Sequence, residues 1–382
     1  MLSGVTVGLV TVGINHLSLR HWHRWQTEHW SERARLFHPV RGTATFNLFL
    51  GAANAGLLGY WLARESPLGV GLFSVVGFAA ALAGNYGVDR KVAPQMDWWS
   101  YCGGAARNWG LIFLLGSLFV GTGWAIRGEE RWPHLGLVLV AFLAVYLPLI
   151  TVGWTPLLRW VGLIRAVPPE LNEWVRQVAT DSGVEVRRVG MLISSLAMAV
   201  ALPFRKEILL TPPLVRILSE AELRCVVHHE LAHLAESPSI LMGRLAGACA
   251  YVPLIFLGPA IRNYPTVGFP AVMLSVAVLS LASTALARRM EVRADRAPAA
   301  SEADGMVSAQ ALERLYEANL IPASGIARGQ PHPDLYDRML SAGLQPDFPR
   351  PKAPHVVNAT FLIWIGLAVM QSVPVAVAWL RR

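Results

Sequence analysis

The sequence predicts a multi-pass α-helical membrane protein with an α+β domain on the cytoplasmic side of the membrane. The chain has 382 residues, of which 54% are hydrophobic and only 15% charged, and its mean hydropathy is +0.42. That composition is too apolar for a single soluble core. Charge-free windows approach or exceed the roughly 20 residues of a spanning helix. These windows are 1–19, 42–63, 66–88, 108–126, 132–158, 245–261, 263–287 and 353–380.

Membrane and polar segments alternate along the chain. Residues 1–158 are expected to form four to five transmembrane helices, 240–287 a transmembrane hairpin, and 353–382 a C-terminal transmembrane helix. The intervening segments 159–239 and 288–352 hold most of the remaining charge. We therefore expect these two segments to form the two parts of the polar domain.

Loop charges predict how the chain is oriented. Segment 20–41 carries five arginines and segment 89–107 three basic residues, whereas 64–65 has one and 127–131 has two. The positive-inside rule places the first two segments in the cytoplasm, and the alternation of spans then places both parts of the polar domain there. The apolar run 1–19 lacks the features of a cleaved signal peptide, so a retained helix with an outward N-terminus is expected.

The overall composition argues against several other classes of protein. The net charge of +8 is spread over loops beside apolar windows, so nucleic acid is not an expected partner. Three distant cysteines indicate neither a disulfide framework nor a thiolate metal site. All basic residues except three lysines are arginines, a skew more typical of a GC-rich bacterial genome. The lysines are Lys91, Lys206 and Lys352.

The pattern of the first polar segment, 159–239, predicts both helices and strands. Apolar residues at three- and four-residue spacing predict a helix over 168–182, and short strands are expected within 184–189, 191–200 and 207–211. A capping box, Ser-Glu-Ala-Glu, then begins a helix that is expected to run over 219–236, where Ser-Pro ends it.

This last helix carries the pattern His-Glu-x-x-His. His229 and His233 are four residues apart, so both imidazoles project from one helical face and can hold a single Zn²⁺. Glu230 lies beside them, where it can polarise a bound water. Because the pattern fixes only three positions, a helix with chance histidines is the alternative. His228 lies on another face and is expected to pack or form hydrogen bonds.

A catalytic zinc needs a third protein ligand. Glu291 and Asp295 are four residues apart, so Glu291 can ligate while Asp295 accepts a hydrogen bond from the outer nitrogen of a ligand histidine. The alternative is an ordinary charged turn beside the membrane. The two apolar windows between His233 and Glu291 favour the ligand, because a two-pass hairpin returns Glu291 to the side of the histidines.

Three motifs together resemble the HtpX and CAAX-prenyl-protease group of membrane zinc endopeptidases, which are gluzincins. The motifs are Val-Val-His-His-Glu-Leu-Ala-His-Leu at 226–234, Arg-Arg-Met-Glu-Val-Arg-Ala-Asp at 288–295, and His-Pro-Asp-Leu-Tyr-Asp-Arg-Met at 332–339. The resemblance implies a zincin-like cytoplasmic catalytic domain, one Zn²⁺ per chain, and a protein or peptide substrate. It leaves the oligomeric state open.

The resemblance also implies further site residues. The segment 332–339 would lie at the active site, with His332 stabilising the oxyanion and Arg338 supporting the loop or a carboxylate. A solvated His and Arg in a proline-rich turn are the alternative. The substrate-facing strand would contain Leu196 and Ala197. Leu196 stands where the family usually has asparagine, which puts the mode of substrate binding in doubt.

The leading hypothesis is an integral-membrane zinc endopeptidase, in a bacterial cell membrane, that cleaves membrane-associated or misfolded proteins at a cytoplasm-facing site. A CAAX-type processing protease and a zinc-containing sensor or transducer are the alternatives. An intramembrane protease is disfavoured because Glu220, Glu222 and Arg224 share the helix of the histidines. A metal transporter is disfavoured because the spans hold few ionisable residues.

Overall fold

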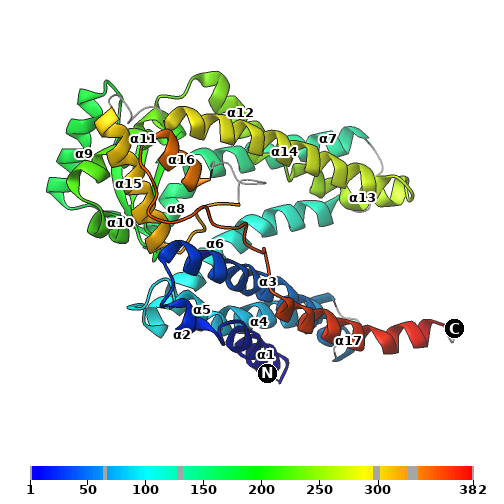
Figure 1. Cartoon of the computed structure of the whole chain (residues 1–382). Helices are drawn as coiled ribbons and strands as arrows, with labels where there is room; N and C mark the ends of the chain where they lie inside the picture. The colour runs from blue at the N-terminus through cyan, green and yellow to red at the C-terminus, as the bar shows by residue number, and fades with distance from the viewer. Residues whose placement is uncertain (1, 63–66, 127–131, 296–301, 326–333, 381–382) are drawn as a thin grey trace. The chain divides into compact units, whose positions relative to one another are not determined.

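In the computed structural model the chain is mostly helical, with one small sheet (Figure 1). Two compact units are described separately below. The structure describes residues 2–62, 67–126, 132–295, 302–325 and 334–380. The first unit comprises Met1–Gly103, Tyr316–Ile326 and Pro346–Arg382, and the second comprises Gly104–Leu315 and Ala327–Gln345.

Five helical stretches of the described chain are long and apolar enough to cross a membrane. They are Gly69–Asp89, Trp98–Ala125, Pro133–Trp160, Pro238–Asn263 and Gly268–Ala294. Two shorter apolar helices are Gly4–Ser18 and Ala359–Ser372. These stretches overlap the windows expected at 66–88, 108–126, 132–158, 245–261 and 263–287. The expected multi-pass helical fold is confirmed.

The window expected at 42–63 is absent from these five stretches of the described chain. It lies in the long helix α3 (Trp30–Leu62), whose apolar half also carries Asn47 and Asn54. Both asparagine side chains are buried. Each donates a hydrogen bond to a neighbouring helix, Asn47 to Asn15 and Asn54 to the carbonyl of Trp364. Polar groups that serve helix packing therefore lower the hydropathy of this window.

The first unit is a helical bundle held by a buried asparagine network. Asn15 donates to the carbonyl of Gly84 at 2.9 Å and to Asn85 Oδ1 at 2.9 Å, and Asn47 donates to Asn15 Oδ1 at 3.0 Å. Trp364 Nε1 donates to Asn47 Oδ1 at 3.0 Å. These bonds tie together α3 and three further helical segments. The other helices are α1 (Leu2–Ser18), α2 (Trp22–Trp25), α4 (Pro67–Gly84), α5 (Tyr86–Asp89), a 3-10 turn (Ala359–Phe361) and α17 (Leu362–Leu380).

The second unit contains further apolar helices. The helix α6 (Trp98–Ala125) begins in the first unit and continues here, and α7 (Trp132–Pro148) passes through a π-helical segment (Leu149–Gly153) into α8 (Trp154–Trp160). A second run contains α12 (Pro238–Ala248), a 3-10 segment (Val252–Phe256), α13 (Leu257–Asn263) and α14 (Gly268–Ala294). The helices α12 and α14 lie side by side (Figure 1).

A four-stranded mixed sheet lies in the same unit. Its order is β1-β2-β4-β3, in which β2 and β4 are parallel and the two outer pairs antiparallel. The strands are β1 (Ile164–Ala166), β2 (Arg188–Leu192), β3 (Ala199–Leu202) and β4 (Glu207–Leu210), with a 3-10 turn (Pro203–Arg205) before β4. The remaining helices are α9 (Pro169–Asp181), α10 (Pro212–Ile217), α11 (Glu220–Leu234), α15 (Glu302–Ala318) and α16 (Leu335–Ser341).

Two strand expectations are wrong in their bounds. Residues 184–187 are not in a strand, because β2 begins at Arg188. The run 191–200 does not form a single strand, because residues 193–198 are a loop between β2 and β3. The hydroxyl of Ser194 accepts the backbone N–H of Leu196 at 3.1 Å, a local bond that replaces a ladder bond. Ala197 is buried in this loop. Leu196 and Ala197 therefore precede the edge strand β3 rather than lying on it.

Candidate metal centre

The site is built on α11, whose start is fixed by its sequence. The hydroxyl of Ser219 accepts the backbone N–H of Glu222, and the Glu222 carboxylate accepts the backbone N–H of Ser219 at 2.8 Å. This is the predicted capping box. At the other end, Lys206 Nζ donates to the carbonyl of Leu234 at 2.6 Å. The helix between them carries the two histidines on a partly buried face.

Three side chains converge between α11 and α14. His229, His233 and Glu291 each offer one ligand atom, and these atoms all lie within 4.8 Å of one another. His229 Nε2 is 3.4 Å from Glu291 Oε2, and His233 Nε2 is 3.5 Å from Glu291 Oε1. Glu291 reaches this position because α14 runs without interruption from the apolar hairpin to Ala294. The structure thus brings together the three ligands proposed from the sequence.

Each imidazole is oriented through its second ring nitrogen. His229 Nδ1 is 3.2 Å from Asp295 Oδ1, and His233 Nδ1 is 2.8 Å from Glu236 Oε1. Such carboxylates fix the tautomer and the ring orientation of a ligand histidine. Both Nε2 atoms therefore point toward the same space beside Glu291. Asp295 occupies the position predicted for it.

Each of these two carboxylates is in turn held by an arginine. Arg338 Nη2 contacts Asp295 Oδ1. On the other side, Arg244 Nε donates to Glu236 Oε2 at 2.7 Å, and Arg244 Nη2 donates to Oε1 at 2.6 Å. A bidentate arginine gives both charge and geometric constraint. Each of the two histidines is therefore held by a carboxylate that is itself held by an arginine.

The electrostatics of the site favour positive charge. Burial alone would lower the pKa of His229, but Asp295 and Glu291 outweigh it and raise that pKa to about 9. The pKa of His233 is likewise lowered by burial but raised by Glu236 and Glu291, to about 9 overall. Burial would raise the pKa of Asp295 and Glu236, yet their histidine and arginine partners hold it below its usual range.

Glu230 lies next to the histidines and against the sheet. Its carboxylate accepts the backbone N–H of Ala201 on β3, and its residue exposure is only 8%. Burial raises the pKa of Glu230, while His229 and His233 oppose that rise. A carboxylate whose pKa is raised toward neutrality suits proton transfer. Glu230 therefore has the position and the environment of a general base.

The donor set fits a metal ion. Two neutral imidazole nitrogens and one carboxylate are a common three-ligand set of catalytic metal sites, which leaves a coordination position for water. Here both Nε2 atoms and the Glu291 oxygens face one another, while the Nδ1 atoms are occupied by Asp295 and Glu236. The same negative field that raises the pKa of both imidazoles would attract a divalent cation.

The other predicted residues are placed as follows. Arg338 contacts Asp295, and its supporting role remains a prediction. His332 lies outside the described residues, so its oxyanion role remains a prediction. Ala197 and Leu196 lie in the loop before β3, and their contact with substrate also remains a prediction. His228 forms a hydrogen bond with Ser182 at 3.2 Å and stands apart from the ligands.

Two residues of the site were missed from the sequence. Glu236 follows His233 by three residues, a spacing that could have indicated a contact within the same turn. Its side chain is buried at the point where α11 has already ended. Arg244 lies on α12, inside an apolar stretch. A charge within such a stretch is itself a signal of function, and its partner here is Glu236.

A family comparison supports this interpretation of the site. Residues 167–342 match the family model described as peptidase family M48. The match covers a little under half of the chain, and it is this segment that is similar to the family. The matched segment contains α11, Glu291 and Arg338, and it includes His332.

Curated proteases are similar to part of this chain. A "Protease HtpX homolog" of Burkholderia mallei (strain SAVP1) is 29% identical over 173 residues, which cover 42% of this chain and 59% of the relative. The protein of the same name from Burkholderia thailandensis is 29% identical over 170 residues, covering 41% and 58%. The chain thus spans less than two thirds of these relatives.

A solved structure resembles the fold of this chain. It is the crystal structure of S. mikatae Ste24p, with a TM-score of 0.59, and the similarity covers 91% of this chain and 99% of that one. The sequence identity is only 12%, so this similarity concerns the fold alone. It confirms the expected membrane fold with a small mixed sheet.

Replacing Glu236 by glutamine should weaken metal binding. The amide cannot provide the negative charge that faces His233 Nδ1, so we expect an affinity loss of about 10- to 100-fold. Competition with a chelator on the purified chain measures it. Glu220→Gln is the matched control, because Glu220 lies on the same helix with 73% of its side chain exposed. An unchanged affinity would show that Glu236 does not position the histidine.

Proposed function

We propose that this chain is an integral-membrane zinc endopeptidase that cleaves membrane-associated or misfolded proteins of a bacterial cell membrane. The observation that carries the proposal is the convergence of His229, His233 and Glu291 beside the buried Glu230. His₂Glu is a ligand set of zinc proteases. The M48 match and the HtpX-like relatives support the same activity.

Zn²⁺ held by His229, His233 and Glu291 would activate water and polarise the scissile carbonyl. The chain's own residues supply the rest. Glu230 takes a proton from the attacking water and delivers it to the leaving amine, for which its raised pKa is suited. Asp295 and Glu236 hold the two imidazoles in place throughout.

The strand β3 offers a place for an extended substrate. It is one of the two outer strands in the sheet order and pairs only with β4 among the described strands. It packs beside α11, and Ala201 on this strand contacts the Glu230 carboxylate. A peptide that adds to such an edge gains backbone hydrogen bonds. Substrate bound there would pass close to the catalytic carboxylate.

The sensor alternative is less well supported. A protein that only senses zinc has no need of a buried proton acceptor next to the ligands. Glu230 occupies that position here and is tied to the edge strand. CAAX-type processing is a narrower version of the proposed activity.

Metal analysis tests the ligand set. The purified chain should contain close to one equivalent of zinc, and His229→Ala, His233→Ala and Glu291→Ala should each lose most of it. His228→Ala is the control, because the neighbouring imidazole contacts Ser182 instead. The wild-type chain should also cleave casein. Full zinc retention by Glu291→Ala would remove that residue from the site, and zinc without cleavage would favour the sensor.

Cysteine labelling tests the proposed cytoplasmic side. In a variant without native cysteines, a cysteine in place of the exposed Gln310 should resist an impermeant reagent in intact cells. One in place of the exposed Thr266, at the tip of the α13–α14 hairpin, should react. Both should react in permeabilised cells. The opposite pattern in intact cells would invert the topology.

A further inference from the structure

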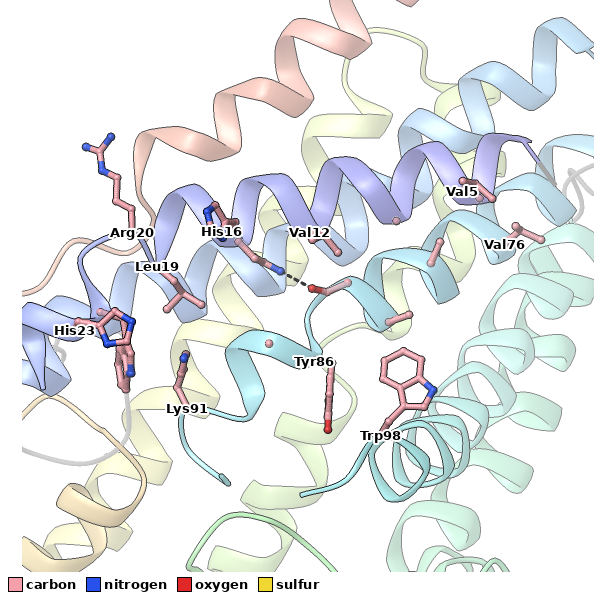
Figure 2. A pocket seen from close by; sticks show the side chains of 18 residues that line it. Val5, Val12, His16, Leu19, Arg20, His23, Val76, Tyr86, Lys91 and Trp98 are labelled. Atoms are coloured by element: carbon pink, nitrogen blue, oxygen red, sulfur yellow. Dashed lines mark hydrogen bonds between the residues drawn. The ribbon is translucent and has the colours of Figure 1, made fainter. Parts of the chain in front are cut away.

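A cavity separate from the metal centre lies in the first unit. It has a volume of about 1060 Å³ and is lined by α1, α4, α5 and the segments that follow α1 and α5, with the first residue of α6 (Figure 2). All of these residues belong to Met1–Gly103. The two ends of the cavity differ in chemistry.

One end of the cavity is apolar. It is lined by Gly4, Val5 and Gly8 of α1 and by Val76 and Ala80 of α4. From Gly4 to the polar end of α1 at residue 16 the helix rises about 18 Å. The hydrocarbon part of one lipid leaflet is about 15 Å thick. The apolar part of the cavity therefore matches the length of a single acyl chain.

The other end of the cavity is basic. Lys91, His23, Arg20 and His16 line it, and none of the lining residues is acidic. In Figure 2, His23 and Lys91 lie on one side of α1, whereas Arg20 extends from its other side. Lys91 Nζ lies 5.3 Å from the centre of the Trp22 ring. Lys91 and His23 therefore form the basic mouth of the cavity.

Lys91 does not form an ion pair with Asp89, the acidic residue nearest to it in the sequence. Asp89 is two residues away, but its carboxylate interacts with Tyr101 and Arg41. No ion pair joins Lys91 to an acidic side chain in the described part of the chain. The basic mouth is thus available to an anion.

Two aromatic residues indicate the depth at which the basic mouth of the cavity lies in the membrane. Tyr86 and Trp98 line the cavity, and their rings pack edge to face with centroids 5.2 Å apart. Trp98 is 38% exposed. Amphipathic rings of this kind gather where acyl chains meet headgroups. The cavity therefore has its apolar part at the depth of acyl chains and its basic mouth at the depth of phosphates.

We propose that this cavity binds one anionic glycerophospholipid. Its acyl chain lies along α1 and α4, and its phosphate is held by Lys91 and His23. A free phosphate would leave the apolar part empty, and a zwitterionic lipid would bring its own cation to the basic mouth. The positive charge of segments 20–41 and 89–107 favours the cytoplasmic leaflet, where anionic lipids attract basic residues. This site is independent of the zinc centre.

Native mass spectrometry of the full-length chain in detergent tests the proposal. With equal amounts of palmitoyl-oleoyl phosphatidylglycerol and palmitoyl-oleoyl phosphatidylcholine, the wild-type chain should retain one phosphatidylglycerol in preference. Lys91→Gln should weaken this retention about fivefold, the amount expected for one basic residue near a lipid surface. Arg24→Gln is the control, because Arg24 is exposed in the same basic segment but does not line the cavity.

A second pair of variants tests the shape of the cavity. At Gly87, which lines it, an added Cβ would meet no atom within 4 Å, so Gly87→Leu should fit and obstruct the mouth. It should abolish the retained phosphatidylglycerol. Gly13→Leu is the matched control, since Gly13 is equally unobstructed but lies outside the cavity. Equal loss in both leucine variants, equal retention of the two lipids, or displacement of the lipid by inorganic phosphate would overturn the proposal.

Discussion

Glu230→Gln is expected to leave zinc bound and to reduce casein cleavage by about 100- to 10,000-fold. Loss of general acid and base catalysis alone has an effect of that order. The amide is nearly isosteric with the carboxylate, and its oxygen can still accept the backbone N–H of Ala201. The amide cannot take a proton from the attacking water. Turnover at saturating casein, with zinc content measured on the same sample, checks both parts.

The structure also predicts what this variant should not change. Glu230 is buried, so the nearly isosteric, uncharged amide removes a buried charge without opening a cavity. The metal-free variant should therefore be no less stable to thermal unfolding than the wild-type chain. Glu220→Gln, on the exposed side of the same helix, should retain full activity. Near wild-type cleavage by Glu230→Gln would exclude the proposed role.

Local spacing explains why much of the site was predictable. His229 and His233 share a face because the capping box fixes one helix around both of them. Asp295 follows Glu291 by four residues, so its approach to His229 also follows from helical spacing. The return of Glu291 to the histidines required only that the two apolar windows form a hairpin.

Other parts of the site depend on tertiary contacts. The helix was expected to continue through Glu236, but α11 ends at Leu234, and the buried carboxylate turns toward His233 and Arg244. The pairing of Arg338 with Asp295 joins distant parts of the chain. The break at 193–198 arises from a serine side chain that competes with strand pairing. Apart from the three-residue spacing of His233 and Glu236, periodicity in the sequence carries none of this information.

The affinity of the site for Zn²⁺ is expected to rise steeply with pH and to level off above about 9. In the metal-free chain the pKa of each imidazole is raised to about 9, so both hold a proton at pH 7. A metal must displace these protons, because only the neutral ring can ligate. The positive charge of His229 lowers the pKa of His233, so the second proton is held less tightly. The dissociation constant should therefore fall by 10- to 100-fold per pH unit below about 9.

Calorimetry in two buffers of different ionisation enthalpy measures the protons released on zinc binding. Between one and two should be released at pH 7, and fewer in Asp295→Asn, because Asp295 supplies the largest of the interactions that raise the pKa of His229. Absence of proton release at pH 7 would contradict the raised pKa of both imidazoles.

The same pKa shifts predict that the stability of the metal-free chain and the stabilisation added by zinc depend on pH in opposite directions. In the metal-free chain, folding raises the pKa of both histidines from 6.5 to about 9. The resulting stabilisation is complete below pH 6.5 and is lost as pH rises through about 9. Zinc stabilises the folded chain in proportion to its affinity, which rises over that same interval. Between pH 6.5 and 9, the unfolding temperature of the metal-free chain should therefore fall, whereas the increase in unfolding temperature caused by zinc should grow.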